Sequence, residues 1–269
     1  MINKLIATDL DGTFWTDDKR FNEVKFENLL DHLEAVGGHF VVSTGNDRAT
    51  VDRVMNKFIG RFDYVVNNGA QIITKENHTV GLHKIGHDLS AEIYRTILSM
   101  DVQLEHGIVF VTDRVGYMFS SDRGQGNLAY IMEDEFPELQ SIDSVKDINE
   151  EILKIIIRVS EGVAESVMDN IQASVRNAAH VTTSGYGAID IVPANTNKAV
   201  GLAELAKYYN LSLSQELVAF GDGRNDLEML QVADTGYAMP NGDQELVKVF
   251  PTAHSDNNHD GVLDTLLLR

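Results

Sequence analysis

Two short apolar runs, one near the amino terminus and one far along the chain, each lead directly into an acidic turn. Residues 5–7 precede Asp9-Leu10-Asp11-Gly12, and residues 217–220 precede a turn at 221–226 that reads Gly-Asp-Gly-Arg-Asn-Asp. Short apolar runs of this kind are typical of buried strands, and glycine allows a sharp turn where a strand ends. Carboxylates held close together repel one another unless a cation lies between them. We therefore expect both parts of the chain to build one site for a divalent cation, Mg²⁺.

Charge and composition exclude several classes of partner. The formal net charge of −19 opposes binding to nucleic acids and to anionic lipid surfaces. No apolar stretch approaches the ~20 residues of a membrane helix, and the absence of cysteine excludes disulfides and thiolate metal sites. We expect a cytoplasmic protein, a monomer or a weak homodimer, whose partner is neither nucleic acid nor membrane.

Strand-like and helix-like segments alternate in the first part of the chain and again in the last. Helical spacing of apolar residues from 26 to 36 precedes a strand-like run at 39–42, and a predicted helix at 48–59 precedes a predicted strand at 63–66. The later alternation has a predicted helix at 197–209 and a strand at 217–220. This pattern indicates an α/β fold with a doubly wound, Rossmann-like parallel sheet, whose strand ends form the usual ligand site.

The middle of the chain follows a different pattern. Residues 152–159 are rich in branched residues and favour a strand, and other short strands and helices surround them. We interpret residues 83–190 as an inserted α+β cap, with residues 1–82 and 191–269 forming the core. The helices predicted for the insertion cover residues 90–100, 126–133 and 162–177, and the strands cover 108–112, 117–120, 152–159 and 180–183.

Polar residues at the ends of core elements suit phosphoryl transfer. Asp9 can attack phosphorus to form an acyl phosphate, and Asp11 can protonate the leaving oxygen and later deprotonate water. Asp222 would complete an all-oxygen Mg²⁺ site with Asp9 and Asp11. Lys198 would stabilise charge in the transition state. The residues predicted to bind the substrate phosphate are Thr44, Gly45, Lys198 and Asn225. Thr44 and Lys198 are also predicted to be catalytic, together with Asp9 and Asp11.

Each of these residues, taken alone, also fits a simpler structural role. Asp-Leu-Asp-Gly is a common turn sequence, and Thr44 fits a helix cap. Lys198 fits a solvated residue near a helix start, although a helix dipole does not favour a cation there. Asp222 fits a turn. The combination, rather than any single member, favours catalysis.

In order and spacing these motifs resemble the four motifs of the haloacid dehalogenase-like (HAD) superfamily of phosphatases. Asn68-Gly69-Ala70, the run at 189–193 and the size of the insertion are similar to the Cof-type sugar-phosphatase branch with its type IIB α+β cap. The resemblance implies an aspartyl-phosphate intermediate, Mg²⁺, and a cap that closes over small phosphorylated metabolites, often sugar phosphates. The matching motifs are Asp9-Leu10-Asp11-Gly12-Thr13, Ser43-Thr44-Gly45, Lys198 and residues 221–226.

Two positions depart from the common pattern of that family. The second motif commonly reads Thr-Gly-Arg, whereas this chain has Thr44-Gly45-Asn46. The third commonly reads Ser-Lys-Gly, whereas this chain has Asn197-Lys198-Ala199 and keeps the lysine. The lost arginine bears on substrate choice rather than on the chemistry.

The hypothesis drawn from these residues is a Mg²⁺-dependent phosphoric monoester hydrolase. A sugar phosphomutase, which would pass the phosphoryl group to a sugar hydroxyl, is a close alternative. A non-enzymatic binding protein in which phosphorylated Asp9 acts as a signal is a second alternative. Asp11 argues against the signalling protein, because a general acid/base would hasten loss of the phosphoryl group.

Overall fold

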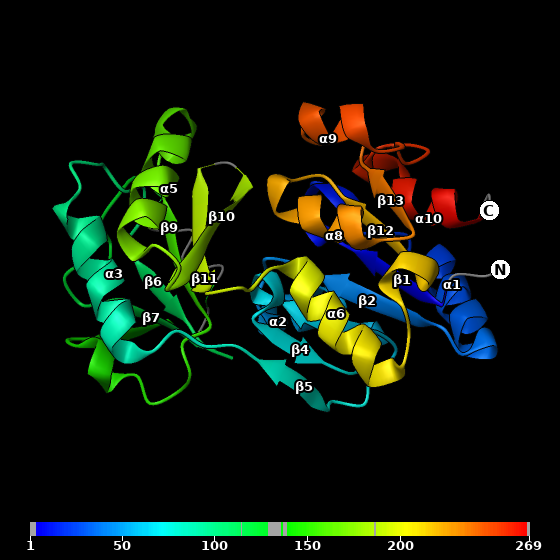
Figure 1. Ribbon diagram of the computed structural model, residues 1–269, viewed down its shortest axis with the longest axis horizontal. Coiled ribbons are helices and arrows are strands. Elements are labelled where there is room, and N and C mark those ends of the chain that lie inside the picture. The colour runs from blue at the N-terminus through cyan, green and yellow to red at the C-terminus, as the bar shows by residue number, and fades with distance from the viewer. Residues whose placement is uncertain (1–3, 114, 129–135, 137–138, 186, 268–269) are drawn as a thin grey trace. The chain divides into compact units, whose positions relative to one another are not determined.

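The computed structural model describes residues 4–113, 115–128, 136, 139–185 and 187–267, and the chain forms two compact units (Figure 1). The core unit takes in Met1–Asn46, Val51–Gly81 and Asn197–Arg269, and the inserted unit takes in Asp47–Thr50 and Leu82–Thr196. Within the described residues, no helix has the length and apolar character needed to cross a membrane.

A seven-stranded sheet forms the centre of the core unit. Its strand order is β13-β12-β1-β2-β3-β4-β5; the first five strands are parallel and β4 is antiparallel to β3. Chain order runs in opposite directions on the two sides of β1, so a topological switch point lies between β1 and β12. The predicted doubly wound α/β fold is confirmed. The strands are β1 (Leu5–Thr8), β2 (His39–Ser43), β3 (Asp63–Val66), β4 (Gln71–Ile73), β5 (Thr79–Leu82), β12 (Leu217–Gly221) and β13 (Thr235–Ala238).

Helices cover both faces of this sheet. Alternate residues of a strand point to opposite faces, so Ile6 packs with α1, α2 and α10 while Leu5 and Ala7 pack with α6, α8 and α9. Both faces are thereby buried, which explains why the strands read as continuous apolar runs. The helices are α1 (Glu23–Val36), α2 (Arg48–Val54), α6 (Lys198–Tyr209), α8 (Leu227–Val232), α9 (Gln244–Val249) and α10 (Gly261–Leu267), and the short α7 covers Leu213–Glu216.

Capping residues set where the helices nearest the strand ends begin. The Asn197 side chain accepts a hydrogen bond from the Val200 N–H, which starts α6 and puts Lys198 in its first turn.

The helix predicted at residues 48–59 is shorter in the structure, because α2 ends at Val54 and a 3₁₀ turn, η2 (Asn56–Phe58), follows. Further short turns follow the strands at η1 (Leu10–Phe14), η3 (Asn67–Gly69) and η5 (Arg224–Asp226).

A six-stranded sheet forms the inserted unit, and the two long helices among its described residues pack on one face of that sheet. The order is β10-β11-β9-β6-β7-β8, and all pairs are antiparallel except β7 with β8. Apolar residues of α3 and α5 pack against Phe110, Ile155 and Ile157 of this sheet. The elements are α3 (His87–Ser99), β6 (Val109–Val111), β7 (Gly116–Phe119), β8 (Gln140–Ile142), β9 (Lys154–Arg158), α5 (Glu161–Val175), β10 (Ala179–Gly185) and β11 (Ala188–Pro193).

The boundary and one helix predicted for the inserted unit differ from what the structure describes. A boundary after residue 190 would divide β11, which pairs with β10 along its whole length, so residues 191–196 group with the inserted unit. In the helix expected at 126–133, residues 129–133 lie outside the described residues, and residues 126–128 form a bend and a turn.

Candidate active site

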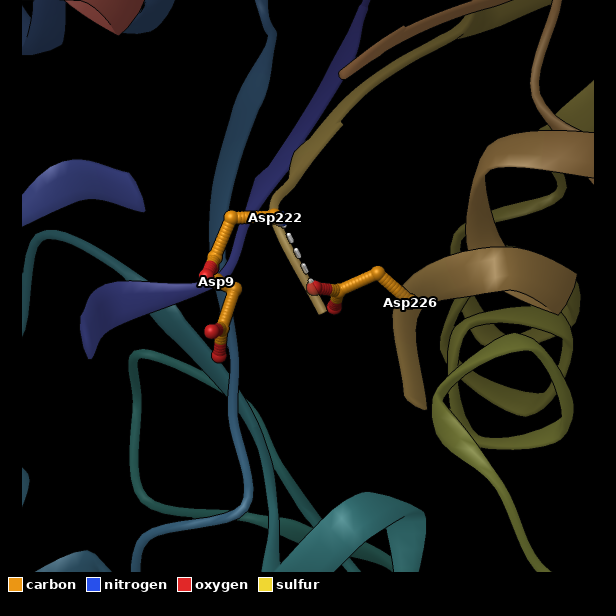
Figure 2. Close-up of side chains that lie close together, drawn as sticks. All are labelled: Asp9, Asp222 and Asp226. Atoms are coloured by element: carbon orange, nitrogen blue, oxygen red, sulfur yellow. Dashed lines mark hydrogen bonds between the residues drawn. The ribbon is translucent and has the colours of Figure 1, made fainter. Parts of the chain in front are cut away.

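Asp9 and Asp222 follow neighbouring strands at the switch point of the core sheet. Asp9 comes directly after β1, where its N–H donates to the carbonyl of Phe220 at 3.0 Å, and Asp222 comes directly after β12. One carboxylate oxygen from each of Asp9, Asp222 and Asp226 lies within 4.8 Å of the other two (Figure 2). Two segments far apart in the sequence therefore form one acidic cluster, which we call the acidic site.

A left-handed glycine allows the two acidic segments to approach. Gly12 has φ +72°, and a β-carbon at this position would lie 2.5 Å from Asp222 Oδ2. The next residue, Thr13, donates its hydroxyl to Asp222 Oδ1 at 2.6 Å, and the Asn241 amide donates to the Gly12 carbonyl at 2.7 Å. Any larger residue at position 12 would push the Asp222 carboxylate out of place.

Lys198 lies buried between two of the acids. Its Nζ is 2.8 Å from Asp9 Oδ1 and 2.6 Å from Asp226 Oδ1, and its side chain is 0% exposed. The second oxygen of Asp226 accepts the backbone N–H groups of Asp222 and Gly223, each at 3.0 Å. Asp226 thus balances the charge of Lys198 and fixes the turn that carries Asp222.

The protonation of these groups follows from their burial and mutual charge. Burial raises the pKa of Asp9 well above its ordinary value; the Lys198 charge opposes this rise, and the Asp226 and Asp222 charges add to it. Burial, with the Asp226 charge, also raises the pKa of Asp222 to about 6. For Lys198, burial lowers the pKa, but attraction to Asp226 and Asp9 outweighs burial and the pKa is raised. Lys198 therefore stays charged, and a further cation beside Asp9 and Asp222 would favour the ionised forms of these two carboxylates.

The donor set of the acidic site suits a hard divalent cation. Within the described part of the chain, no protein donor contacts Oδ2 of Asp9 or Oδ2 of Asp222, whereas both oxygens of Asp226 are already engaged. Three ionised carboxylates and one lysine carry a net charge of −2, which a divalent cation balances. Carboxylate oxygens are ligands that Mg²⁺ prefers. Asp9 and Asp222 are thus the side chains placed to hold the metal.

Asp11 lies outside the acidic site. Its side chain is 51% exposed; Lys19 Nζ is 3.6 Å from Oδ1, and the Asn46 amide donates to Oδ2 at 2.5 Å. The structure therefore places Asp226, and not the Asp11 carboxylate, beside Asp9 and Asp222. The physical reason is that β1 ends at Thr8, so the alternation of a strand, which would point residues 9 and 11 the same way, no longer applies.

The end of β2 carries the predicted phosphate-binding residues. Thr44 is buried, and its hydroxyl oxygen accepts the backbone N–H and the side-chain amide of Asn46, both at 3.1 Å. Gly45 between them is buried as well. The Asn68 N–H donates to the Thr44 carbonyl at 3.0 Å, and the Asn225 amide donates to Asn68 Oδ1 at 3.0 Å. Asn225 thus reaches the end of β2 through Asn68.

Four polar residues of this region make contacts that the sequence did not predict, although three of them, Thr13, Asn46 and Asn68, stand in the motifs named above. Thr13, Asn46 and Asn68 each make a hydrogen bond with a predicted site residue, and Asn241 donates to the carbonyl of Gly12, next to Asp11. The signal that was available is position, because Asn46 and Asn68 closely follow β2 and β3 as Thr13 follows β1. Their partners depend on turn geometry, which spacing alone does not give.

Comparisons with known proteins agree on one family. A family model described as haloacid dehalogenase-like hydrolase matches residues 6–266. The 5-amino-6-(5-phospho-D-ribitylamino)uracil phosphatase YbjI of Escherichia coli is 26% identical over 98% of this chain and 94% of its own length. The crystal structure of a Streptococcus mutans protein has a TM-score of 0.89 and 28% identity, covering 100% of this chain and 98% of that one. A HAD subclass IIB sugar phosphatase shares the fold, with a TM-score of 0.78 and 18% identity over 98% of each chain.

Proposed function

The chain belongs to the haloacid dehalogenase-like hydrolases, and from that membership we propose that it is a Mg²⁺-dependent phosphatase of small phosphorylated metabolites that works through an aspartyl phosphate. The family resemblance drawn from the motifs is confirmed. The observation that carries the proposal is the Asp9 carboxylate, which Lys198 holds by one oxygen while no donor in the described residues contacts the other. A carboxylate held in this way is placed to attack phosphorus.

The residues of the site divide the work of two successive steps. In the first step Asp9 attacks phosphorus, the bond from phosphorus to the leaving oxygen breaks, and Asp11 gives that oxygen its proton. In the second step water attacks the phosphorus of the aspartyl phosphate, its proton passes to Asp11, and the bond from Asp9 to phosphorus breaks. Free phosphate is released and both aspartates return to their starting states.

Lys198 and the metal offset the negative charge of substrate and acids. The Lys198 ammonium has three hydrogens, and Asp9 and Asp226 take two of them, so one is available for a phosphate oxygen. Mg²⁺ held by Asp9 and Asp222 would neutralise these carboxylates and polarise the phosphate, so that an anion can approach. Thr44 and Gly45, which follow β2, and Asn225 in η5 are proposed to bind the remaining phosphate oxygens.

Sugar phosphates are the substrate class that we propose. The family resemblance favours them, and two of the compared phosphatases are named for a ribityl phosphate and for sugar phosphates. We propose that the inserted unit acts as a cap and determines which substrate is bound.

A phosphate-release screen with Mg²⁺ tests the proposal. The panel contains sugar phosphates, 5-amino-6-(5-phospho-D-ribitylamino)uracil, nucleotides and vitamin phosphates, each measured with Mg²⁺ and with EDTA. We expect Mg²⁺-dependent release of phosphate that Asp9→Asn abolishes, while the matched control Asp18→Asn, at an exposed residue of the same segment, retains it. If Asp9→Asn were as active as the control, the assignment of Asp9 as the nucleophile would be refuted.

The same screen separates the two alternatives by their products. A phosphomutase would convert a sugar phosphate to its isomer with little free phosphate. A signalling protein would keep its phosphoryl group for minutes and would turn over none of the panel.

A further inference from the structure

We propose that Asn46 is a positioning residue that holds the Asp11 carboxylate for proton transfer and links it to the phosphate-binding hydroxyl of Thr44. The proposal rests on the function proposed above, because it gives Asn46 its role through Asp11. It concerns only residues of the core unit, at the ends of β1 and β2.

One side-chain amide makes both contacts. The Asn46 Nδ2 carries two hydrogens, and it lies 2.5 Å from Asp11 Oδ2 and 3.1 Å from Thr44 Oγ1. The backbone of Asn46 is itself fixed, since its N–H donates to Thr44 Oγ1 at 3.1 Å and its carbonyl accepts the Asn67 N–H at 2.9 Å. The amide therefore projects from a backbone held on both sides, which limits how far it can move.

Asp11 depends on this contact for its orientation. Half of its side chain is exposed, and among the described residues the Asn46 amide is the one hydrogen-bond donor to its carboxylate. The other neighbour, Lys19, is 44% exposed and stands 3.6 Å away, in the range where an exposed ion pair contributes little. Without Asn46, the carboxylate would be free to turn toward solvent.

A neutral amide suits a group that must change its charge. Asp11 carries a proton at the start of the first step, gives it to the leaving oxygen, and is ionised until the second step. An amide can donate to Oδ2 in both states, because the proton of the protonated state resides on Oδ1. A cation at this position would favour the ionised carboxylate and oppose its protonation. The neutral donor therefore orients Asp11 without fixing its charge.

The second contact bears on Thr44. The Thr44 hydroxyl oxygen accepts two N–H groups from Asn46, which occupy both of its lone pairs. Its own hydrogen is then directed away from Asn46 and is available to a phosphate oxygen. Asn46 thus sets the relative positions of the group that delivers the proton and a group that binds the phosphate.

The leaving group provides the readout. A weakly basic leaving group such as p-nitrophenolate needs little protonation in the transition state, whereas the more basic phenolate depends on Asp11. General acid catalysis contributes roughly 10²–10⁴ in rate, and a misplacement of about 1 Å can remove about 10² of it. Loss of orientation at Asp11 therefore affects phenyl phosphate more than p-nitrophenyl phosphate.

The experiment compares kcat/KM for these two substrates in Asn46→Ala and the unsubstituted protein with Mg²⁺. We expect the phenyl to p-nitrophenyl ratio of kcat/KM to fall about tenfold or more in Asn46→Ala. The matched control is Asn56→Ala, at an exposed asparagine of the core unit, which leaves the ratio unchanged. In an Asp11→Asn background, Asn46→Ala has no further effect on the ratio, because the role of Asn46 passes through Asp11.

The outcomes separate this inference from the function on which it rests. If, with Mg²⁺, the unsubstituted protein releases phosphate from neither aryl phosphate nor any compound of the panel above, the proposed function fails and the inference fails with it. If it acts on panel compounds alone, kcat for the fastest of them replaces the ratio, and an Asn46→Ala protein with unchanged kcat overturns the inference. If it hydrolyses both aryl phosphates and Asn46→Ala lowers both by the same factor, only the inference is overturned. If Asn46→Ala does not fold, Asn46→Ser is measured in the same way, and an unchanged ratio there also overturns the inference.

Discussion

Replacing Lys198 by Met removes the only positive charge that faces Asp9 and Asp226 among the ion pairs of the described residues. Lys198 is 0% exposed and lies 2.8 Å from Asp9 and 2.6 Å from Asp226, so both carboxylates lose a partner in the same step. The methionine side chain fills much of the lysine volume without restoring the charge. The variant therefore isolates the electrostatic part of the contact.

The expected loss of stability is large because both partners are buried. Removing one member of a buried ion pair costs about 3–5 kcal/mol, mostly because the remaining charge is left unpaired. Protonation of Asp9 limits this cost, since burial already raises its pKa. We therefore expect the free energy of unfolding at neutral pH to fall by about 3 kcal/mol, a large fraction of the 5–15 kcal/mol of a typical domain.

Urea unfolding followed by tryptophan fluorescence measures this loss. The chain has 1 tryptophan, and this residue, Trp15, is 0% exposed in the core unit, so its emission reports on that unit. The matched control is Lys207→Met, at an exposed position of the same helix, where about 0.5 kcal/mol or less is expected. A Lys198→Met protein within about 1 kcal/mol of that control would refute the argument that the buried charges depend on Lys198.

Three further predictions concern the acidic site. In Gly12→Ala the new β-carbon would lie 2.5 Å from Asp222 Oδ2, and we expect this variant to bind Mg²⁺ at least about tenfold more weakly, as measured by calorimetry. The control is Gly37→Ala, where φ is +69° and no atom lies within 4 Å of the new β-carbon, so only stability should fall. Equal Mg²⁺ affinities in the two variants would contradict this prediction. Because burial and the Asp226 charge raise the pKa of Asp222 to about 6, protons compete with Mg²⁺, and its apparent dissociation constant should rise about tenfold per pH unit below about pH 6. In EDTA the same group should make stability fall as pH rises from about 4 to about 6, since its folded pKa exceeds its unfolded one. Asp222→Asn should make that slope shallower and leave the part that the raised pKa of Asp9 contributes.

Position along parallel strands explains how much of the site could be predicted. Asp9 and Asp222 follow apolar runs that become β1 and β12, and the carboxyl ends of neighbouring parallel strands meet at one edge of a sheet. Lys198 opens a helix that packs on the same sheet, so its place also follows from the order of elements. The α/β core was predictable for the same reason, because strands buried on both faces give continuous apolar runs.

Turn geometry explains what could not be predicted. The direction of the Asp11 side chain depends on the backbone after β1, where Asp11 has ψ 127° and Gly12 has φ 72°. These angles decide that Asp11 meets Asn46 rather than the acidic site, and no periodic pattern encodes them. The short edge strand β8 was missed because Gln140-Ser141-Ile142 is too brief and too polar to give a strand signal.

Asp9 is proposed to accept the phosphoryl group, and trapping the phosphorylated intermediate tests this role most directly. The protein is mixed with p-nitrophenyl phosphate and Mg²⁺, quenched in acid within milliseconds, digested and analysed by mass spectrometry. We predict one phosphoryl group on the peptide that contains Asp9, and none on that peptide in Asp9→Asn. Steady hydrolysis with no label on that peptide, or a label on any other residue, would contradict it.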